Sequence, residues 1–236
     1  MVKAAEYVDK LIFDYLGKDR TAVYLSYTQF FLENDVKSGN LWVQYDEKGN
    51  ITAVLSVCQK DKTLLFADEN TDFEELSAII NGIVVSPDKL PFLPIDKKYL
   101  LHISVQSTSQ STGIKYTRFG EIKRLNTELL PDFADDISYK MYLNLKGRCE
   151  GALIEENGEI ISGGFISFNE DAAIISDIYT KAQYRNRGKG TVIVKKLLTL
   201  SPCEDVYLVC EEHNLDFYEN IGFEKAGEIY EYKSKG

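Results

Sequence analysis

Hydrophobic and polar residues follow two periods along this chain, and the change of period separates helices from strands. From Ala4 to Leu16 the apolar side chains recur every three or four positions, which predicts an amphipathic helix that ends at Gly17. The same period predicts a second helix over residues 22–36. Three strands are then predicted as a meander joined by short polar turns, at residues 40–45, 51–59 and 63–67.

Capping and turn residues shape the segment that follows the meander. Thr71 and Glu74 have the spacing of a capping box, which predicts a helix through Ile80. A loop is predicted next, marked by Pro87, Pro91 and Pro94.

A polar cluster near the middle of the chain indicates a domain boundary. At 236 residues the chain is long for one domain and has room for two. Between Gln106 and Gly113 the residues are mainly Ser, Thr, Gln and Gly, as in an interdomain segment. We therefore expect two domains, residues 1–112 and residues 113–236.

The second half repeats the order of elements in the first. The Asn157-Gly158 pair has the composition of a tight hairpin turn between two strands. Strands are predicted at residues 116–124, 151–155, 159–168, 172–180, 206–210 and 227–232, and helices near 127–130, 135–145, 191–198 and 215–220. Each half therefore contains helices, a three-stranded meander and a further helix. The expected fold class is α+β with a mixed sheet.

Composition narrows the classes of partner. The formal net charge of −10 argues against nucleic acid as the main partner. It is compatible with a cationic substrate such as an amine, and equally with plain solubility. No apolar run reaches transmembrane length, so no membrane association is expected.

Cysteine and histidine usage indicates compartment and metal content. The four cysteines are scattered, and residues 1–10 contain no apolar signal-peptide core, which together indicate reduced thiols and a cytoplasmic location. Two histidines and dispersed cysteines do not offer a four-ligand cluster, so no metal is expected.

The richest chemistry lies in the turn between the strand at 172–180 and the helix at 191–198. Gly188 and Gly190 allow a tight bend with no Cβ in the way, so that several amide N–H groups point to one place at the positive end of a helix. That arrangement binds anions, most naturally a phosphate or diphosphate. Three cations of the same turn add formal charge: Arg185, Arg187 and Lys189.

The first half lacks this turn. Residues 66–70, Phe-Ala-Asp-Glu-Asn, stand in its place, and their acidic side chains would repel a phosphate. Only the second half is therefore expected to hold such a ligand.

Two motifs resemble those of one protein family. Arg185-Asn186-Arg187-Gly188-Lys189-Gly190 matches Q/R-x-x-G-x-G/A, the signature of the GCN5-related N-acetyltransferases (GNAT superfamily). Residues 217–223 match the family's Y-x-x-x-G-F element. The resemblance covers residues 116–232, and the whole chain looks like a tandem GNAT protein with a degenerate first half. It implies a GNAT fold in the second half and a smaller GNAT-like first half.

The resemblance also implies a donor and a binding site for it. The expected acyl donor is acetyl-CoA, held by the turn through its diphosphate and by the preceding strand through its pantetheine arm. The strands at 172–180 and 206–210 would splay apart, with the acyl group between them. The residues expected to bind acetyl-CoA are Ile178, Tyr179, Thr180, Arg185, Asn186, Arg187, Gly188, Lys189, Gly190 and Thr191.

Catalytic roles follow from the same resemblance. Tyr218 is the expected general acid for the leaving thiolate, and the alternative is that its ring only packs beside Phe217 and Phe223. Asp177 is a candidate base acting through water. Ser176 occupies the same neighbourhood, and further candidates lie beyond the next strand at Glu211, Glu212 and His213. For each candidate base the alternative is a solvated charge. The asparagine that often precedes the family's tyrosine by seven residues is replaced by Glu211, and Asn214 is nearer.

The expected activity is acetyl transfer to a primary amine, either a small molecule or a peptide. The alternative is a module that binds acyl-CoA without turnover, as a sensor or in an interaction. A purely structural protein fits poorly with a glycine turn that collects three cations. The sequence sets neither the acceptor nor the oligomeric state.

Overall fold

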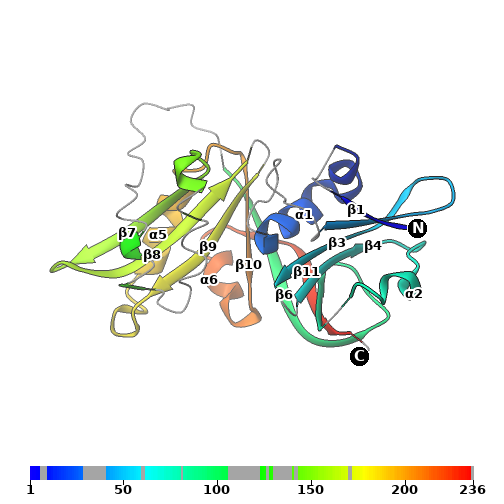
Figure 1. Ribbon diagram of the computed structural model, residues 1–236. Coiled ribbons are helices and arrows are strands. Elements are labelled where there is room, and N and C mark those ends of the chain that lie inside the picture. Colours follow the sequence, from blue (N-terminus) through cyan, green and yellow to red (C-terminus); the bar gives the residue numbers. More distant parts are fainter. Residues whose placement is uncertain are drawn as a thin grey trace. The chain divides into compact units, whose positions relative to one another are not determined.

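The computed structural model describes residues 1–5, 10–28, 41–59, 62–80, 82–105, 123–125, 128–129, 140, 143–169 and 172–234. These form two compact units that are not continuous along the chain (Figure 1). Unit 1 contains Met1–Leu101, Val209–Leu215 and Lys225–Gly236, and unit 2 contains His102–Leu208 and Asp216–Glu224. The division expected between residues 112 and 113 falls outside the described residues.

Unit 1 is built on one mixed sheet. Its strands lie in the order β1-β2-β3-β4-β5-β11-β6. The elements are β1 (Val2–Ala5), α1 (Lys10–Thr28), β2 (Leu41–Tyr45), β3 (Ile51–Gln59), β4 (Lys62–Ala67), α2 (Phe73–Leu76), β5 (Ile83–Ser86), β6 (Leu93–Ser104) and β11 (Glu224–Lys233). Strands β2, β3 and β4 are antiparallel, which confirms the predicted meander, and β4 pairs with β5 in parallel.

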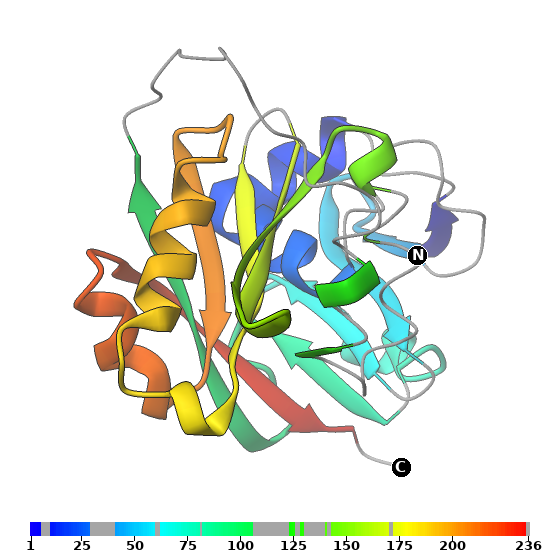
Figure 2. The same ribbon diagram turned by 90° about the vertical axis from the view of Figure 1, so that its left-hand side faces the viewer.

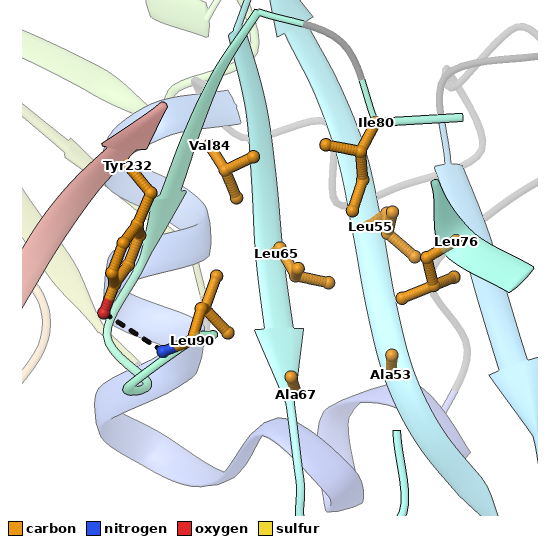
Figure 3. Close-up of a cluster of buried hydrophobic side chains, with 9 residues drawn as sticks. All are labelled: Ala53, Leu55, Leu65, Ala67, Leu76, Ile80, Val84, Leu90 and Tyr232. Carbon is orange, nitrogen blue, oxygen red and sulfur yellow. Dashed lines mark hydrogen bonds between the residues drawn. The ribbon is translucent and has the colours of Figure 1, made fainter. Parts of the chain in front are cut away.

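A cluster of buried aliphatic residues fills one side of this sheet (Figure 3). Leu55 and Leu65 come from neighbouring strands, and Leu76 comes from α2. The Tyr232 hydroxyl accepts a hydrogen bond from the Leu90 amide at 3.2 Å, so the polar end of this ring is satisfied inside the cluster.

The start of the chain differs from the sequence prediction. Val2–Ala5 is a strand paired with β2, because pairing with a neighbouring strand overrides a local helical pattern. Gly17 interrupts α1 with φ 66°, as expected, and the helix resumes at once instead of at Ala22. The end predicted for the second helix lies outside the described residues.

Two predictions for the segment after β4 were wrong. Asp72, not Thr71, caps α2, because its carboxylate accepts the amides of Glu74 and Glu75. The proline-rich segment was predicted as a loop, yet it contains β5 and β6. Pro94 is the second residue of β6, a strand start where a missing N–H is tolerated.

Unit 2 repeats this arrangement of strands. Its strand order includes β10-β9-β8-β7, with β7, β8 and β9 antiparallel and β9 parallel to β10. The elements are β7 (Cys149–Glu156), β8 (Glu159–Phe168), β9 (Ala173–Thr180), the 3-10 turn η2 (Ala182–Tyr184), α5 (Lys189–Leu198), β10 (Asp205–Cys210), the 3-10 turn η3 (Glu212–Asn214) and α6 (Leu215–Glu219). The last two residues of β10, all of η3 and Leu215 at the start of α6 belong to unit 1. The elements predicted from residue 151 onward are confirmed to within a few residues.

Local chemistry explains the hairpin and the helix of unit 2. Asn157 and Gly158 both have positive φ, at 54° and 81°, as a tight hairpin turn requires. Helix α5 packs on β7, β8 and β9 through Ile193, Val194 and Leu197, which are buried (Figure 2). The internal repeat predicted from the pattern of elements is therefore present in the backbone of both units.

Candidate functional site

Strand β9 has a partner on one side for only part of its length. It pairs in parallel with β10 from Ala173 to Ile175, opposite Val206 to Leu208. On that side, residues 176–180 have no strand partner in the part of the chain that the structure describes. The backbone groups of this edge are therefore available to a ligand that pairs like a strand.

A β-bulge marks the point where the pairing ends. On the other side of β9, Tyr179 faces Gly163 and Ser176 faces Phe165, so Asp177 and Ile178 together face the single residue between them. Asp177 has φ 53°, which is uncommon for a residue with a side chain.

Gly164 faces the bulge at close range. A Cβ added at Gly164 would lie 2.3 Å from Cδ1 of Ile178 and 3.4 Å from its Cα, so the Ile178 side chain would have to move. Nothing in the sequence indicated that Gly163 and Gly164 of β8 belong to the site, because a glycine in a strand does not reveal which residue approaches it.

The end of β9 is fixed by three polar contacts. Ser162 Oγ donates to the Tyr179 carbonyl at 3.0 Å and lies 2.8 Å from Thr180 Oγ1. Arg185 Nε donates to the Thr180 carbonyl at 3.0 Å, and its guanidinium lies 5.7 Å from the centre of the Tyr179 ring. Arg185 is thus engaged in holding the strand end in place.

The glycine turn presents a row of backbone donors. Asn186 and Gly188 have φ 58° and 73°, and α5 begins directly after Gly188, which offers no capping side chain. The first helical hydrogen bond runs from the Val192 amide to the Gly188 carbonyl at 3.1 Å. Within the described chain, the N–H groups of residues 186–191 have no acceptor. They lie at the positive end of a ten-residue helix.

The positive charge at the turn is smaller than the sequence suggests. Lys189 forms an ion pair with Glu156, and Lys181 forms one with Glu159 at 2.6 Å, so the β7–β8 hairpin neutralises two cations. Arg187 is exposed and has no ion-pair partner among the residues that the structure describes. Arg185 donates to a neutral carbonyl and keeps its charge, so backbone donors, Arg187 and Arg185 provide most of the attraction for an anion.

An aromatic side chain joins the turn to α6. A Cβ on Gly190 would lie 3.2 Å from Cζ of Phe217 and 3.7 Å from Thr180 Oγ1. The centres of the Phe217 and Tyr218 rings lie 4.8 Å apart, and those of the Tyr218 and Phe223 rings lie 5.9 Å apart. The structure thus brings half-buried Tyr218 and the turn together in unit 2 through Phe217, a contact that no motif in the sequence indicated.

Asp177 is engaged in an ion pair that the sequence did not reveal. Its carboxylate pairs with Lys140, whose side chain is only 7% exposed and whose ammonium lies 4.4 Å from the centre of the Phe165 ring. Ser176 Oγ also donates to Asp177 Oδ2 at 3.0 Å. Lys140 is 37 positions away in the sequence, so only tertiary structure could identify it.

The other candidate bases lie in unit 1, whereas Asp177 and Tyr218 lie in unit 2. His213 Nδ1 lies 3.3 Å from the Glu211 carboxylate, and both side chains are exposed. Glu212 accepts a hydrogen bond from the Tyr99 hydroxyl at 3.3 Å. Within unit 2, Asp177 and Ser176 are the candidates that the bulge brings together.

Cysteines and metal ligands add no chemistry to this site. Cys149, Cys203 and Cys210 are buried and form no disulfide among the described residues, and burial raises the pKa of the Cys149 thiol to about 11. In the described ranges, no three metal-ligating side chains are grouped. Within those same ranges, no helix has the length and apolar character needed to cross a membrane.

Comparison with known families identifies the second part of the chain. Residues 148–225 match the model of the acetyltransferase (GNAT) domain. This segment is a GNAT domain. It contains the bulged strand, the glycine turn, α5 and the aromatic residues of α6.

Solved structures show the same fold over a longer part of the chain. A GCN5-related N-acetyltransferase from Kribbella flavida matches with a TM-score of 0.57 at 11% identity, covering 78% of this chain and 87% of that one. A GCN5-related N-acetyltransferase from Sphaerobacter thermophilus matches with a TM-score of 0.56 at 9% identity, covering 100% of this chain and 96% of that one. A tandem GNAT protein from the clavulanic acid biosynthesis pathway matches with a TM-score of 0.50 at 13% identity, covering 83% of each chain. The last match is consistent with a tandem arrangement of two similar folds.

The buried ion pair gives a prediction about stability. Lys140→Met keeps the length of the side chain and removes its charge, leaving a mostly buried Asp177 carboxylate unpaired. We expect the free energy of unfolding, measured with urea, to fall by about 3 kcal/mol. The double variant Lys140→Met, Asp177→Asn should be less destabilised, because no charge is then left without a partner.

An exposed ion pair provides the control. Lys181→Met breaks the pair with Glu159, whose side chain is 47% exposed, and should cost about 0.5 kcal/mol or less. Equal losses for Lys140→Met and Lys181→Met would show that the Lys140 pair contributes no more than a surface contact.

Proposed function

We propose that this chain is an N-acyltransferase that moves an acetyl group from acetyl-CoA to a primary amine. The observation that carries the proposal is the row of unused N–H groups at residues 186–191, within the segment that matches the GNAT domain. Six successive donors around a helix N-terminus have no acceptor within the described chain and are available to an anion, and a diphosphate supplies several acceptors at once.

The turn and the strand edge have complementary roles in this proposal. The diphosphate binds the N–H groups between Arg187 and Thr191, with Asn186 and Gly188 setting the bend. The pantetheine arm pairs with the edge of β9 at Ile178, Tyr179 and Thr180. Because the Thr180 carbonyl already accepts from Arg185, we infer that Ile178 provides the main pairing.

Acyl transfer then requires positioning and two proton movements. The amine nitrogen attacks the thioester carbonyl, the tetrahedral intermediate collapses, and the carbon–sulfur bond breaks. Tyr218 donates its hydroxyl proton to the departing thiolate, with its ring held by Phe217 and Phe223. Asp177 takes a proton from the amine through a water molecule. The acceptor class that we propose is a small-molecule amine or a peptide.

A second function has one observation in its favour. Asp177 shares its carboxylate with Lys140 and Ser176, so the candidate base of unit 2 is already engaged. A domain that binds acyl-CoA without turnover, as a sensor, fits that arrangement. Release of free thiol from acetyl-CoA in the presence of a panel of amines distinguishes an enzyme from a sensor, since a sensor releases none.

Binding of the donor tests the turn. Gly188→Glu places a negative charge in the row of donors and a side chain at positive φ, so we expect affinity for CoA to fall roughly 100-fold by calorimetry, equivalent to losing about two charge-assisted hydrogen bonds. Gly227→Glu is the matched control, since a Cβ there meets nothing within 4 Å and the residue lies in β11. Unchanged affinity in Gly188→Glu would rule out the turn as the diphosphate site.

Turnover tests the general acid. Tyr218→Phe keeps the ring between its aromatic neighbours and removes only the hydroxyl, so kcat should fall about 100-fold while CoA affinity stays the same. Tyr207→Phe removes a hydroxyl from a buried ring of β10 and should leave kcat unchanged. If Tyr218→Phe also retains full kcat, the tyrosine serves packing alone.

Substitution tests Asp177 as the base. Asp177→Asn removes the proton acceptor and should lower kcat/KM about 100-fold. The double variant Lys140→Met, Asp177→Asn leaves no buried charge unpaired and should show the same loss. If both variants keep the wild-type kcat/KM, Asp177 acts only as the partner of Lys140, which would favour a base outside unit 2 or none.

A further inference from the structure

Unit 1 repeats the strands of unit 2, but its own hydrogen bonds close the place where a ligand would bind. We propose that unit 1 holds no acyl-CoA and that each chain therefore binds one. The number of sites rests on the proposed function of unit 2, whereas the closure of unit 1 rests on its own contacts.

The two units can be aligned through their strand register. Strands β4 and β5 pair in parallel at Lys62–Leu64 and Ile83–Val85, as β9 and β10 do at their first three paired residues. On the other side of β4, the Asp68 N–H donates to the Thr52 carbonyl of β3 as the Lys181 N–H donates to the Ile161 carbonyl of β8. Ala67, which faces Ala53, is thus the counterpart of Thr180, which faces Ser162, on the free edge of β9.

Two charged side chains occupy the backbone groups of Ala67. Its N–H donates to Asp88 Oδ2 at 2.9 Å, and its carbonyl accepts from Arg20 Nη2 at 3.1 Å. Arg20 and Asp88 also pair with each other at 2.6 Å. A pantetheine arm would have to displace an ion pair to reach this residue of the strand.

The turn after β4 also consumes its own donors. The Asp68 N–H reaches both the Thr52 carbonyl at 3.1 Å and Thr71 Oγ1 at 2.9 Å. The Asn70 N–H donates to Asp68 Oδ1 at 2.7 Å, and the Thr71 N–H donates to the Asp68 carbonyl at 3.3 Å. The corresponding turn of unit 2 leaves its N–H groups unused.

The helix after this turn is closed to anions in the same way. Asp72 accepts the amides of Glu74 and Glu75 at 3.0 and 3.1 Å, so a carboxylate already sits at the start of α2. The side chains of Glu74 and Glu75 add negative charge to the first turn, where a diphosphate would be repelled.

The segment that carries Asp88 is anchored in the core of unit 1. The Asp88 N–H donates to Ser86 Oγ at 3.0 Å, and its carbonyl accepts from the Tyr232 hydroxyl at 2.9 Å. The same hydroxyl accepts from the Leu90 amide (Figure 3). Asp88 is therefore held toward Ala67 by both flanking strands, β5 and β11.

Helix α1 also helps to close the edge of β4, through Arg20 and Tyr15. Arg20 lies 5.6 Å from the centre of the Tyr15 ring, and the Tyr15 hydroxyl donates to the Thr52 carbonyl at 2.8 Å. Burial raises the pKa of Tyr15 well above its usual range, so this ring stays neutral and keeps its donor proton. One helix thus contacts both the edge of β4 at Ala67 and the Thr52 carbonyl, which also accepts the Asp68 amide of the turn.

The number of binding sites tests the proposal. Calorimetric titration of the full chain with CoA should give one site per chain, and Gly188→Glu, checked for folding by circular dichroism, should abolish it. Two sites, or a site that persists in Gly188→Glu, would overturn the closure of unit 1. No binding to the wild type would contradict the proposed function of unit 2 and leave unit 1 closed, as proposed.

Hydrogen exchange provides a readout that needs no variant. CoA should slow exchange at residues 185–191 and leave residues 62–71 unchanged, whereas protection of 62–71 would overturn the proposal even if Gly188→Glu failed to fold.

A substitution in the Arg20–Asp88 ion pair tests whether this pair closes the edge of β4. Asp88→Ala should speed exchange of the Ala67 amide and lower the melting temperature by about 5 °C, because that amide loses its acceptor and Arg20 loses its ion-pair partner. Asp19→Ala removes an exposed carboxylate from α1 and should change neither quantity. An Ala67 amide that exchanges equally fast in Asp88→Ala and wild type would show that the edge of β4 is not closed by Asp88.

Discussion

Backbone hydrogen bonding at one strand–turn–helix junction determines what this chain can bind. The main-chain N–H groups from Asn186 to Thr191 have no acceptor within the described chain, so they are available to a ligand. The positive φ of Asn186 and Gly188 sets this geometry, and α5 begins without a capping side chain. The bulge at Asp177 and the short pairing with β10 place an open strand edge directly before the row of donors. The proposed acyl-CoA function depends on this succession.

The two units show how one topology can serve two purposes. Both have three antiparallel strands and a fourth strand in parallel, and they differ in what the backbone donors meet after the third strand. In unit 1 the carboxylates of Asp68, Asp72 and Asp88 take those donors. In unit 2 glycines occupy the turn, and the Glu156 carboxylate pairs with Lys189. Supplying an internal acceptor adds stability and removes the capacity to bind an anion.

Motifs made of neighbouring residues were predicted well. The hairpin at Asn157-Gly158, the glycine turn and the strands around them follow from local backbone preferences, so they were found to within a few residues. Features that depend on distant partners were not. Strands β5 and β6 were missed because the segment is rich in proline. Pairing with β4 and β11, which the sequence does not show, makes these residues extended. Nothing in the sequence indicated Lys140, which pairs with Asp177, or the contact of Phe217 with Gly190.

The sequence by itself determined the GNAT motifs, the position of the turn and the absence of its counterpart in the first half. These properties are local, because a glycine or an acidic residue acts on the backbone within a few positions of itself. Tertiary structure decided which donors remain unused and which charges are neutralised. Arg20 reaches Ala67 and Asp88, and Glu156 reaches Lys189, only after the strands have paired. A hydrogen bond depends on distance and angle between groups that the fold brings together, and the order of residues does not specify either one.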